Sequence, residues 1–255
     1  MITFKKLGKV GQLGNQMFQY AFLHAVNKKT GIDIGFDYNN KPILTKIFDI
    51  KLKDSSKIIQ TKYLHENNTC EFIDPGSVND GTDLIGYFQN YKYIQEYENE
   101  LKNIFVFNEE KYKKCYNFIK EFKNRIKKDL VSIHVRRTDF LKASDVHNVC
   151  DDKYFLNAIG HFSRDYFFVI FTDDPVFAEY SFANIPCVIM NNDTEEDLIL
   201  MSLCNHNIIS NSSYSWWGSW LNENTNKKII APKRWYNKIG PKEWENIYRP
   251  NMILI

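Results

Sequence analysis

The chain has 255 residues, which is enough for one large domain or two smaller ones, and we favour two. Hydrophobic residues make up 44% and charged residues 25%, a balance that is typical of a globular protein and excludes a disordered one. The formal net charge of +2 gives no general attraction to nucleic acid or to an acidic membrane, so any anion site has to be local.

The chain begins with a pattern that favours a parallel sheet. A short strand in MITF is followed by a loop with Gly8, Gly11 and Gly14, then by a helix that ends before Gly31, and then by a second strand in IDIGF. The loop lacks the Gly-Lys-Ser of a phosphate-binding loop, and its spacing differs from the dinucleotide fingerprint. A tight turn into the helix is a sufficient explanation for these glycines.

Two amide side chains, Asn15 and Gln16, stand at the start of this helix. They could reach the other half of the molecule across a cleft. The polar stretch 38–83 that comes after the helix and the second strand shows no strong periodicity, and we place no elements in it.

A long amphipathic helix is predicted over 111–128, where apolar residues recur at helical spacing among lysines. Its lysine-rich face could contact anionic lipid, although a solvated outer face is the commoner explanation. We interpret this helix as the connection between two halves. After it, the runs LVSIHV, YFFVIF, CVIM, HNIIS and KKIIAP alternate with helical segments, which indicates a second doubly wound unit.

Two adjacent arginines, Arg136 and Arg137, stand where the strand in LVSIHV ends. Ligands of parallel α/β sheets bind beyond the carboxyl ends of the strands, where His134 and Asp139 also lie. Since successive side chains of a strand point to opposite faces, we expect one arginine to bind an anion and the other to be held by carboxylates such as Asp139. The alternative is an ion-pair network that only stabilises a domain edge.

Two further strand ends carry polar groups. Ser212 and Ser213 stand where the strand in HNIIS runs into an aromatic helix. Serines at a helix start can cap the free backbone amides there. Those amides and the helix dipole together form an anion site. The alternative is that the serines only cap the helix. The tandem Trp216 and Trp217 indicate packing rather than stacking on a ligand. In FTDDP, Asp174 before Pro175 is predicted to cap a helix, whereas Asp173 is freer and could accept paired hydrogen bonds from a base such as guanine.

The chain resembles the bacterial α-1,2-fucosyltransferases of glycosyltransferase family 11 almost from end to end. The similar segments are GQLGNQMFQYAF, GYFQNYKYI, VSIHVRRTDF, CDDKYFLNAI, FTDDP, LMSLCNHNIISNSSYSWWGSWLN and APKRWY. The resemblance implies an α/β protein of GT-B type with two facing Rossmann-like doubly wound domains. We expect an acceptor-side domain over 1–125 and a GDP-fucose-binding domain over 126–255, with the last residues packing back on the first domain.

The resemblance also implies GDP-fucose as the donor, a galactose-containing glycan as the acceptor, and inverting transfer without a metal or another cofactor. Arg136 would contact the diphosphate, and Asn15 would lie beside the sugar. The catalytic set is Arg136, Asn15 and Asp139, and the donor-binding set is His134, Arg136, Arg137, Asp173, Asp174, Ser212, Ser213, Gly14 and Gln16. The base that accepts the acceptor's proton is not identified: Asp37 and Asp145 are weak candidates, and a donor phosphate oxygen is the alternative.

Two departures from the family pattern leave the linkage open. Thr138 and Phe140 stand where the family usually has glycine and tyrosine, and the motif HVRRTD is similar to that of α-1,6 and protein O-fucosyltransferases. A carbohydrate-binding protein without catalysis is a second hypothesis, favoured by the aromatic content of 15%. Such a protein would have no need of the arginine pair.

The five cysteines are scattered and form no CxxC pair, so we expect reduced thiols. The amino terminus lacks the apolar core of a signal peptide, and no stretch approaches the roughly 18 apolar residues of a membrane span. We therefore expect a cytoplasmic enzyme of surface polysaccharide synthesis that does not bind nucleic acid. Peripheral contact with the inner membrane and the oligomeric state are left open.

Overall fold

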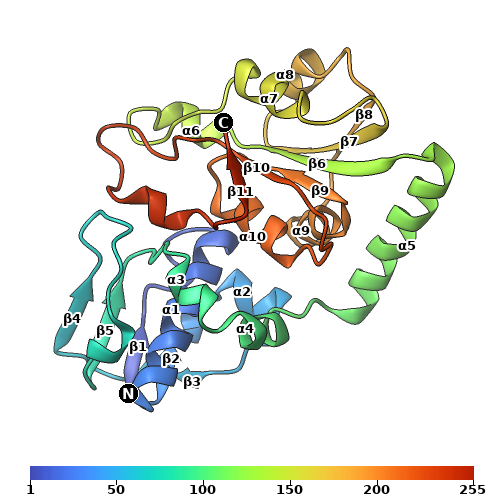
Figure 1. Cartoon of the computed structure of the whole chain (residues 1–255). Coiled ribbons are helices and arrows are strands. Elements are labelled where there is room, and N and C mark those ends of the chain that lie inside the picture. The colour runs from blue at the N-terminus through green and yellow to red at the C-terminus, as the bar shows by residue number, and fades with distance from the viewer. The chain divides into compact units, whose positions relative to one another are not determined.

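The computed structural model describes residues 1–255, which form two compact units (Figure 1). Unit 1 consists of Met1–Phe107 and Pro241–Arg249, and unit 2 consists of Asn108–Gly240 and Pro250–Ile255. The division at residue 107 precedes the boundary expected at residue 125, because the long helix after it packs within unit 2. Residues 241–249 return to unit 1. Residues 250–255 belong to unit 2, whereas the last residues were expected to pack on the first domain.

Unit 1 is built on a five-stranded parallel sheet with the strand order β3-β2-β1-β5-β4. The strands are β1 (Ile2–Phe4), β2 (Ile34–Phe36), β3 (Lys53–Asp54), β4 (Lys62–His65) and β5 (Thr82–Ile85). The helices are α1 (Leu13–Thr30), α2 (Ile43–Ile47), α3 (Lys92–Gln95) and α4 (Glu98–Ile104), with 3-10 turns η1 (Tyr38–Asn40), η2 (Pro75–Ser77) and η3 (Trp244–Ile247). The stretch that had no assigned elements thus supplies short strands and turns of this sheet.

Helix α1 is the main buried helix of unit 1. Phe18 and Phe22 on it are fully buried, and the ring of Phe22 stacks on Phe88 with 4.1 Å between the ring centres. The helix ends at Gly31, whose φ of 68° is in the left-handed region that favours glycine. The predicted order of strand, loop, helix and strand at the start of the chain is confirmed.

Unit 2 contains a six-stranded parallel sheet with the strand order β11-β10-β9-β6-β7-β8. The strands are β6 (Asp129–Val135), β7 (Tyr166–Thr172), β8 (Cys187–Met190), β9 (His206–Ile208), β10 (Ile229–Ala231) and β11 (Met252–Leu254). The helices are α5 (Glu109–Ile126), α6 (Thr138–Lys142), α7 (Asp152–Ile159), α8 (Pro175–Ser181), α9 (Thr194–Leu203) and α10 (Ser213–Leu221). Five of these strands match the predicted apolar runs; β11 was not predicted.

Both faces of the unit 2 sheet are covered by helices, with α7 and α8 on one face and α9 and α10 on the other (Figure 1). Val131 and Ile133 of β6 belong to the buried cluster that includes residues of α7 and α8. Ser132, between them, points to the opposite face and accepts a hydrogen bond from Asn207 at 2.7 Å. This alternation decides which way the residues at the end of β6 can turn.

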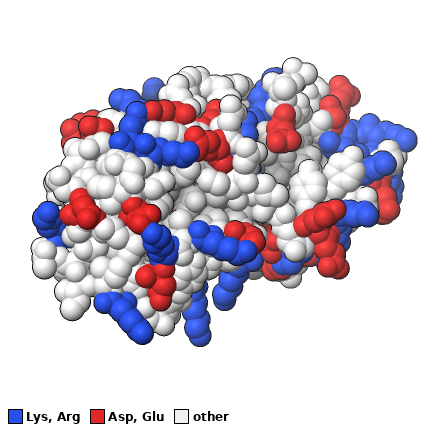
Figure 2. All heavy atoms as spheres, turned by 90° about the horizontal axis from the view of Figure 1, so that it is seen from below, with Lys and Arg blue, Asp and Glu red and all other residues white.

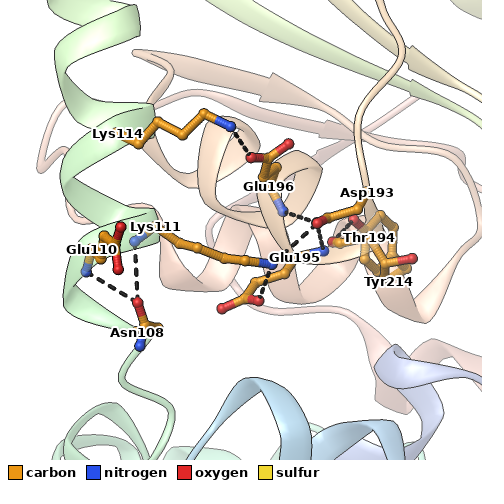
Figure 3. Close-up of polar contacts among 9 residues, drawn as sticks. All are labelled: Asn108, Glu110, Lys111, Lys114, Asp193, Thr194, Glu195, Glu196 and Tyr214. Carbon is orange, nitrogen blue, oxygen red and sulfur yellow. Dashed lines mark hydrogen bonds and ion pairs between the residues drawn. The ribbon is translucent and has the colours of Figure 1, made fainter.

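Helix α5 belongs to unit 2, where charged side chains tie it to α9 (Figure 3). Lys111 bridges Glu195 at 2.7 Å and Asp193 at 3.1 Å, and Lys114 pairs with Glu196 at 2.5 Å. The helix starts two residues before the predicted position, because Asn108 accepts hydrogen bonds from the first backbone amides, including that of Glu110.

Charges of both signs are interspersed over the surface in Figure 2, and neither sign covers that face. This distribution agrees with the net charge of +2. None of the helices combines the length and the apolar character that a membrane crossing requires.

Candidate active site

His134 is the penultimate residue of strand β6, and its side chain is buried. Its Nδ1 lies 2.9 Å from the hydroxyl of Ser210, and its ring lies 5.5 Å from the ring of Tyr214. Burial, with a smaller effect from the Arg136 cation, lowers the pKa of His134 to about 3. The imidazole therefore carries no charge at neutral pH and acts as a link between β6 and the loop that follows β9.

Arg137 turns toward the helices α7 and α8. Its Nε donates to Asp174 at 3.3 Å, and its Nη1 donates to the carbonyl oxygen of Cys150 at 3.2 Å. The guanidinium also lies 3.8 Å from the centre of the Phe177 ring. This arginine is fixed by the protein itself.

Arg136 has different partners, as predicted, although β6 ends at Val135 and the two arginines lie beyond the strand. The Nη2 of Arg136 donates to Asp139 at 2.8 Å, and its Nε lies 3.4 Å from Asp173. We had expected one arginine of the pair to be held by carboxylates, but both are. The Arg136 side chain is 32% exposed and that of Arg137 17%, so Arg136 is the more accessible cation.

Asp173 shapes the turn after β6 and is less free than the sequence suggested. Its Oδ1 accepts from the backbone amide of Arg137 at 2.9 Å, and its Oδ2 accepts from the hydroxyl of Thr138 at 2.6 Å. Asp174 is the predicted helix cap, since its Oδ1 accepts from the amide of Phe177 at 3.1 Å. The two carboxylates thus link the ends of β6 and β7, which are neighbouring strands.

The loop between β9 and α10 is held from both sides. Besides the His134 contact, Asn211 donates to the carbonyl oxygen of Trp235 at 2.8 Å. Ser212 occupies the N-cap position of α10 in an extended conformation, yet its side chain makes no capping hydrogen bond. The capping expected of Ser212 is therefore wrong, because its hydroxyl does not bond to the first-turn amides. Ser213 follows as the first residue of the helix.

The tandem tryptophans of α10 are packing residues, as predicted. Trp216 and Trp217 are both fully buried, and their rings meet edge to face with 5.0 Å between the centres. They fix the helix on its sheet and are not available for stacking on a ligand.

The amide side chains of the glycine loop differ in their environment. Asn15 accepts a hydrogen bond from Gln89 at 2.6 Å through its Oδ1. Gln16 is 3% exposed, donating to Gly11 and accepting from the amide of Leu44, both at 3.1 Å. Gln16 is thus turned into unit 1 and does not offer its amide outward, because both ends of that amide are used inside the unit.

The glycine loop also requires its glycines for close packing. A Cβ at Gly11, where φ is 83°, would lie 2.5 Å from the Cβ of Asn15. Gly14 is buried in the first turn of α1. These glycines position Asn15 at the carboxyl end of β1, which is consistent with the turn predicted there.

The two weak candidates for a base have local roles. Asp37 caps η1 by accepting from the amide of Asn39 at 2.9 Å, and Asp145 accepts from the amide of Val146 at 3.0 Å. In residues 1–255 no three His, Cys, Asp or Glu side chains are grouped so that they could hold a metal ion.

Comparisons with known proteins agree with these site motifs. The family model described as "Glycosyl transferase family 11" matches residues 4–255. The O-antigen biosynthesis glycosyltransferase WbnK of Escherichia coli is 31% identical, over 80% of this chain and 72% of its own. The alpha-1,2-colitosyltransferase of Escherichia coli is 26% identical, over 89% of this chain and 91% of its own.

A solved structure with the same architecture is the fucosyltransferase NodZ from Bradyrhizobium. It has a TM-score of 0.58 and 11% identity, over 85% of this chain and 90% of its own. NodZ, named an alpha-1,6-fucosyltransferase, has also been solved after soaking with GDP-fucose, and that structure gives a TM-score of 0.56. The similarity confirms the expected α/β fold of GT-B type.

Proposed function

The chain belongs to glycosyl transferase family 11, and on this premise we propose that it transfers L-fucose from GDP-fucose to a galactose hydroxyl of a glycan. In this reaction the bond between the sugar carbon and the β-phosphate oxygen breaks, and GDP leaves with the electron pair. The acceptor oxygen bonds to the same carbon from the opposite side and loses its proton. The product has an α-1,2 linkage.

One observation carries the proposal: Arg136 follows strand β6, the start of α10 follows the neighbouring strand β9, and one hydrogen bond joins the ends of these two strands. The link is the hydrogen bond between His134 and Ser210. A cation and a helix start at the ends of neighbouring strands suit a departing diphosphate, because both stabilise the charge that develops on it. Fixed donors of this kind are worth about 3 kcal/mol each in studied enzymes.

The other residues of the predicted donor set support these two groups. Arg137 and Asp174 connect the strand end to α8, and Asp173 holds the turn that carries Arg136. Asp139 pairs with Arg136 and fixes its direction. The guanine contact predicted for Asp173 and the sugar contact predicted for Asn15 stay predictions.

The two relatives support the biological setting of the proposal. One is named for O-antigen biosynthesis and the other for α-1,2 transfer of colitose, so we infer a role in a bacterial surface polysaccharide. Colitosyl transfer is the second candidate, favoured by that relative. A nucleotide-linked colitose donor should therefore be assayed beside GDP-fucose, and the new linkage located by NMR.

A transfer assay with Arg136→Ala tests the proposal. Loss of this donor should lower kcat by about a hundredfold or more at unchanged fold, because it removes charge stabilisation in the transition state. The matched control is Arg164→Ala, since Arg164 is an exposed arginine of the same unit. Transfer in excess EDTA should be unchanged, since the proposal gives charge stabilisation to protein groups. Near-normal turnover of Arg136→Ala would contradict it.

A further inference from the structure

Helix α6, which carries the partner of Arg136, is held by an aromatic stack as well as by Asp173. The ring of Phe140 lies face to face with the imidazole of His147, with 4.0 Å between the ring centres and 4° between the planes. The Arg136 guanidinium lies 6.0 Å from the centre of the same Phe140 ring. Asp139, to which Arg136 donates at 2.8 Å, is the residue before Phe140. The stack is thus one residue away from the ion pair that directs Arg136.

The loop that carries His147 is anchored by Tyr236 and Asn237, at the end of the APKRWY motif. His147 and Tyr236 form an isolated antiparallel bridge, and their ring centres are 5.5 Å apart. The side chain of Asn237 donates to the carbonyl oxygens of Ser144 at 2.6 Å and His147 at 3.0 Å. The backbone amide of Asn237 donates to Val146 at 2.7 Å. The motif thus holds this loop, although none of its residues belongs to the proposed donor set.

His147 contributes the face of its ring rather than a charge. Burial lowers the pKa of His147; the carboxylates of Asp139 and Asp145 oppose this shift, and Arg136 adds to it. The imidazole is therefore uncharged at neutral pH. Its Nδ1 is buried and has no hydrogen-bond partner. A phenylalanine ring has the same kind of flat face and no buried nitrogen, so it should be able to take the place of the imidazole.

We propose that His147 is a positioning residue for the donor diphosphate. Through its stack on Phe140 it passes the anchoring of the APKRWY motif to α6, so that Arg136 keeps the direction that an anion requires. The inference rests on the proposed function, since it gives the stack a role in binding GDP. His147 acts through Arg136 and does not itself contact the donor. The sequence alone gives no signal for this residue, because its contact with Phe140 depends on how the loop folds.

Calorimetry with GDP on variants of the full chain tests this role. His147→Ala removes the stack, and we expect about tenfold weaker binding, the size of effect of one good aromatic contact. His147→Phe keeps the stack and should bind within about twofold of the wild type. The matched control is His161→Ala, since His161 is an exposed histidine of the same unit. Unchanged affinity of His147→Ala, or weak binding by His147→Phe as well, would overturn the positioning role.

A double variant separates positioning from a general loss of stability. If His147 acts through Arg136, then His147→Ala should weaken GDP binding by less than about twofold when Arg136→Ala is already present. A contact that only stabilises the fold would weaken binding by the same factor with and without Arg136. That result would contradict the proposal.

Limited digestion with trypsin examines the same stack without GDP. The bonds after Arg136 and Arg137 can be cut only when the turn opens locally. We expect faster cleavage there in His147→Ala than in the wild type, and the wild-type rate in His147→Phe. Equal rates in all three proteins would overturn the role of His147. Failure of the wild type to bind GDP would instead overturn the proposed function, and the digestion would still show whether the stack holds the turn.

Discussion

The imidazole of His134 and the hydroxyl of Ser210 form a hydrogen bond of 2.9 Å that connects the ends of two neighbouring strands. The imidazole is buried and carries no charge at neutral pH, so His134 does not attract an anion away from Arg136. The hydrogen bond joins the residue two positions before Arg136 to the loop that leads into α10. The structure therefore uses the histidine of the HVRR motif as a support for the charged groups.

The buried His134 should make stability depend on pH. Its pKa is about 3 in the folded protein and ordinary, 6.5, in the unfolded chain, so the unfolded chain binds more protons between these values. Stability is full above pH 6.5 and is lost as the pH falls toward 3, by up to about 1.4 kcal/mol per pH unit. We expect His134→Asn to show a smaller slope of unfolding free energy against pH, measured by urea denaturation. An identical slope would contradict the buried, neutral state.

The turn held by Asp173 should be sensitive to loss of its carboxylate. Asp173→Ala removes the acceptor for the amide of Arg137 and the hydroxyl of Thr138, and we expect a loss of about 1–3 kcal/mol in unfolding free energy. GDP affinity should fall as well, because Arg136 is carried by this turn. Chemical denaturation and calorimetry measure the two effects. Glu179→Ala, an exposed acid of the same unit, should change neither.

The ion pairs between α5 and α9 should contribute unequally. Lys111→Met leaves the carboxylate of Glu195, which is only 10% exposed, without its cation, and we expect a loss of about 2 kcal/mol. Lys114→Met should cost less than about 1 kcal/mol, because the Lys114 side chain is 73% exposed and solvated. Urea denaturation of the two variants gives the comparison. Equal losses would mean that the Glu195 contact is not a buried pair.

Much of the unit 2 sheet could be predicted from the sequence, because its central strands are continuous apolar runs that parallel sheets require. The strands of unit 1 between residues 38 and 83 were not found, since β3 has two residues and both are exposed. The domain boundary was misplaced because an amphipathic pattern shows that α5 has a buried face but not which unit buries it. The ion pairs of Lys111 decide that, and they are tertiary contacts.

The candidate site was predicted in its residues more than in their roles. Arg136 and Arg137 have different partners, as predicted, but the expectation that carboxylates hold only one of them was wrong. The partners of Asp173 depend on the turn at Thr138, and the lack of a cap from Ser212 depends on its side-chain direction; neither follows from local sequence.

The most direct test of the central claim is titration calorimetry with GDP. If the arginine at the end of β6 and the start of α10 bind a diphosphate, the wild type will bind GDP. Arg136→Ala will then bind at least tenfold more weakly, a difference of about 1.4 kcal/mol, while Arg164→Ala binds normally. No heat with the wild type, or equal affinity of Arg136→Ala, would contradict the account.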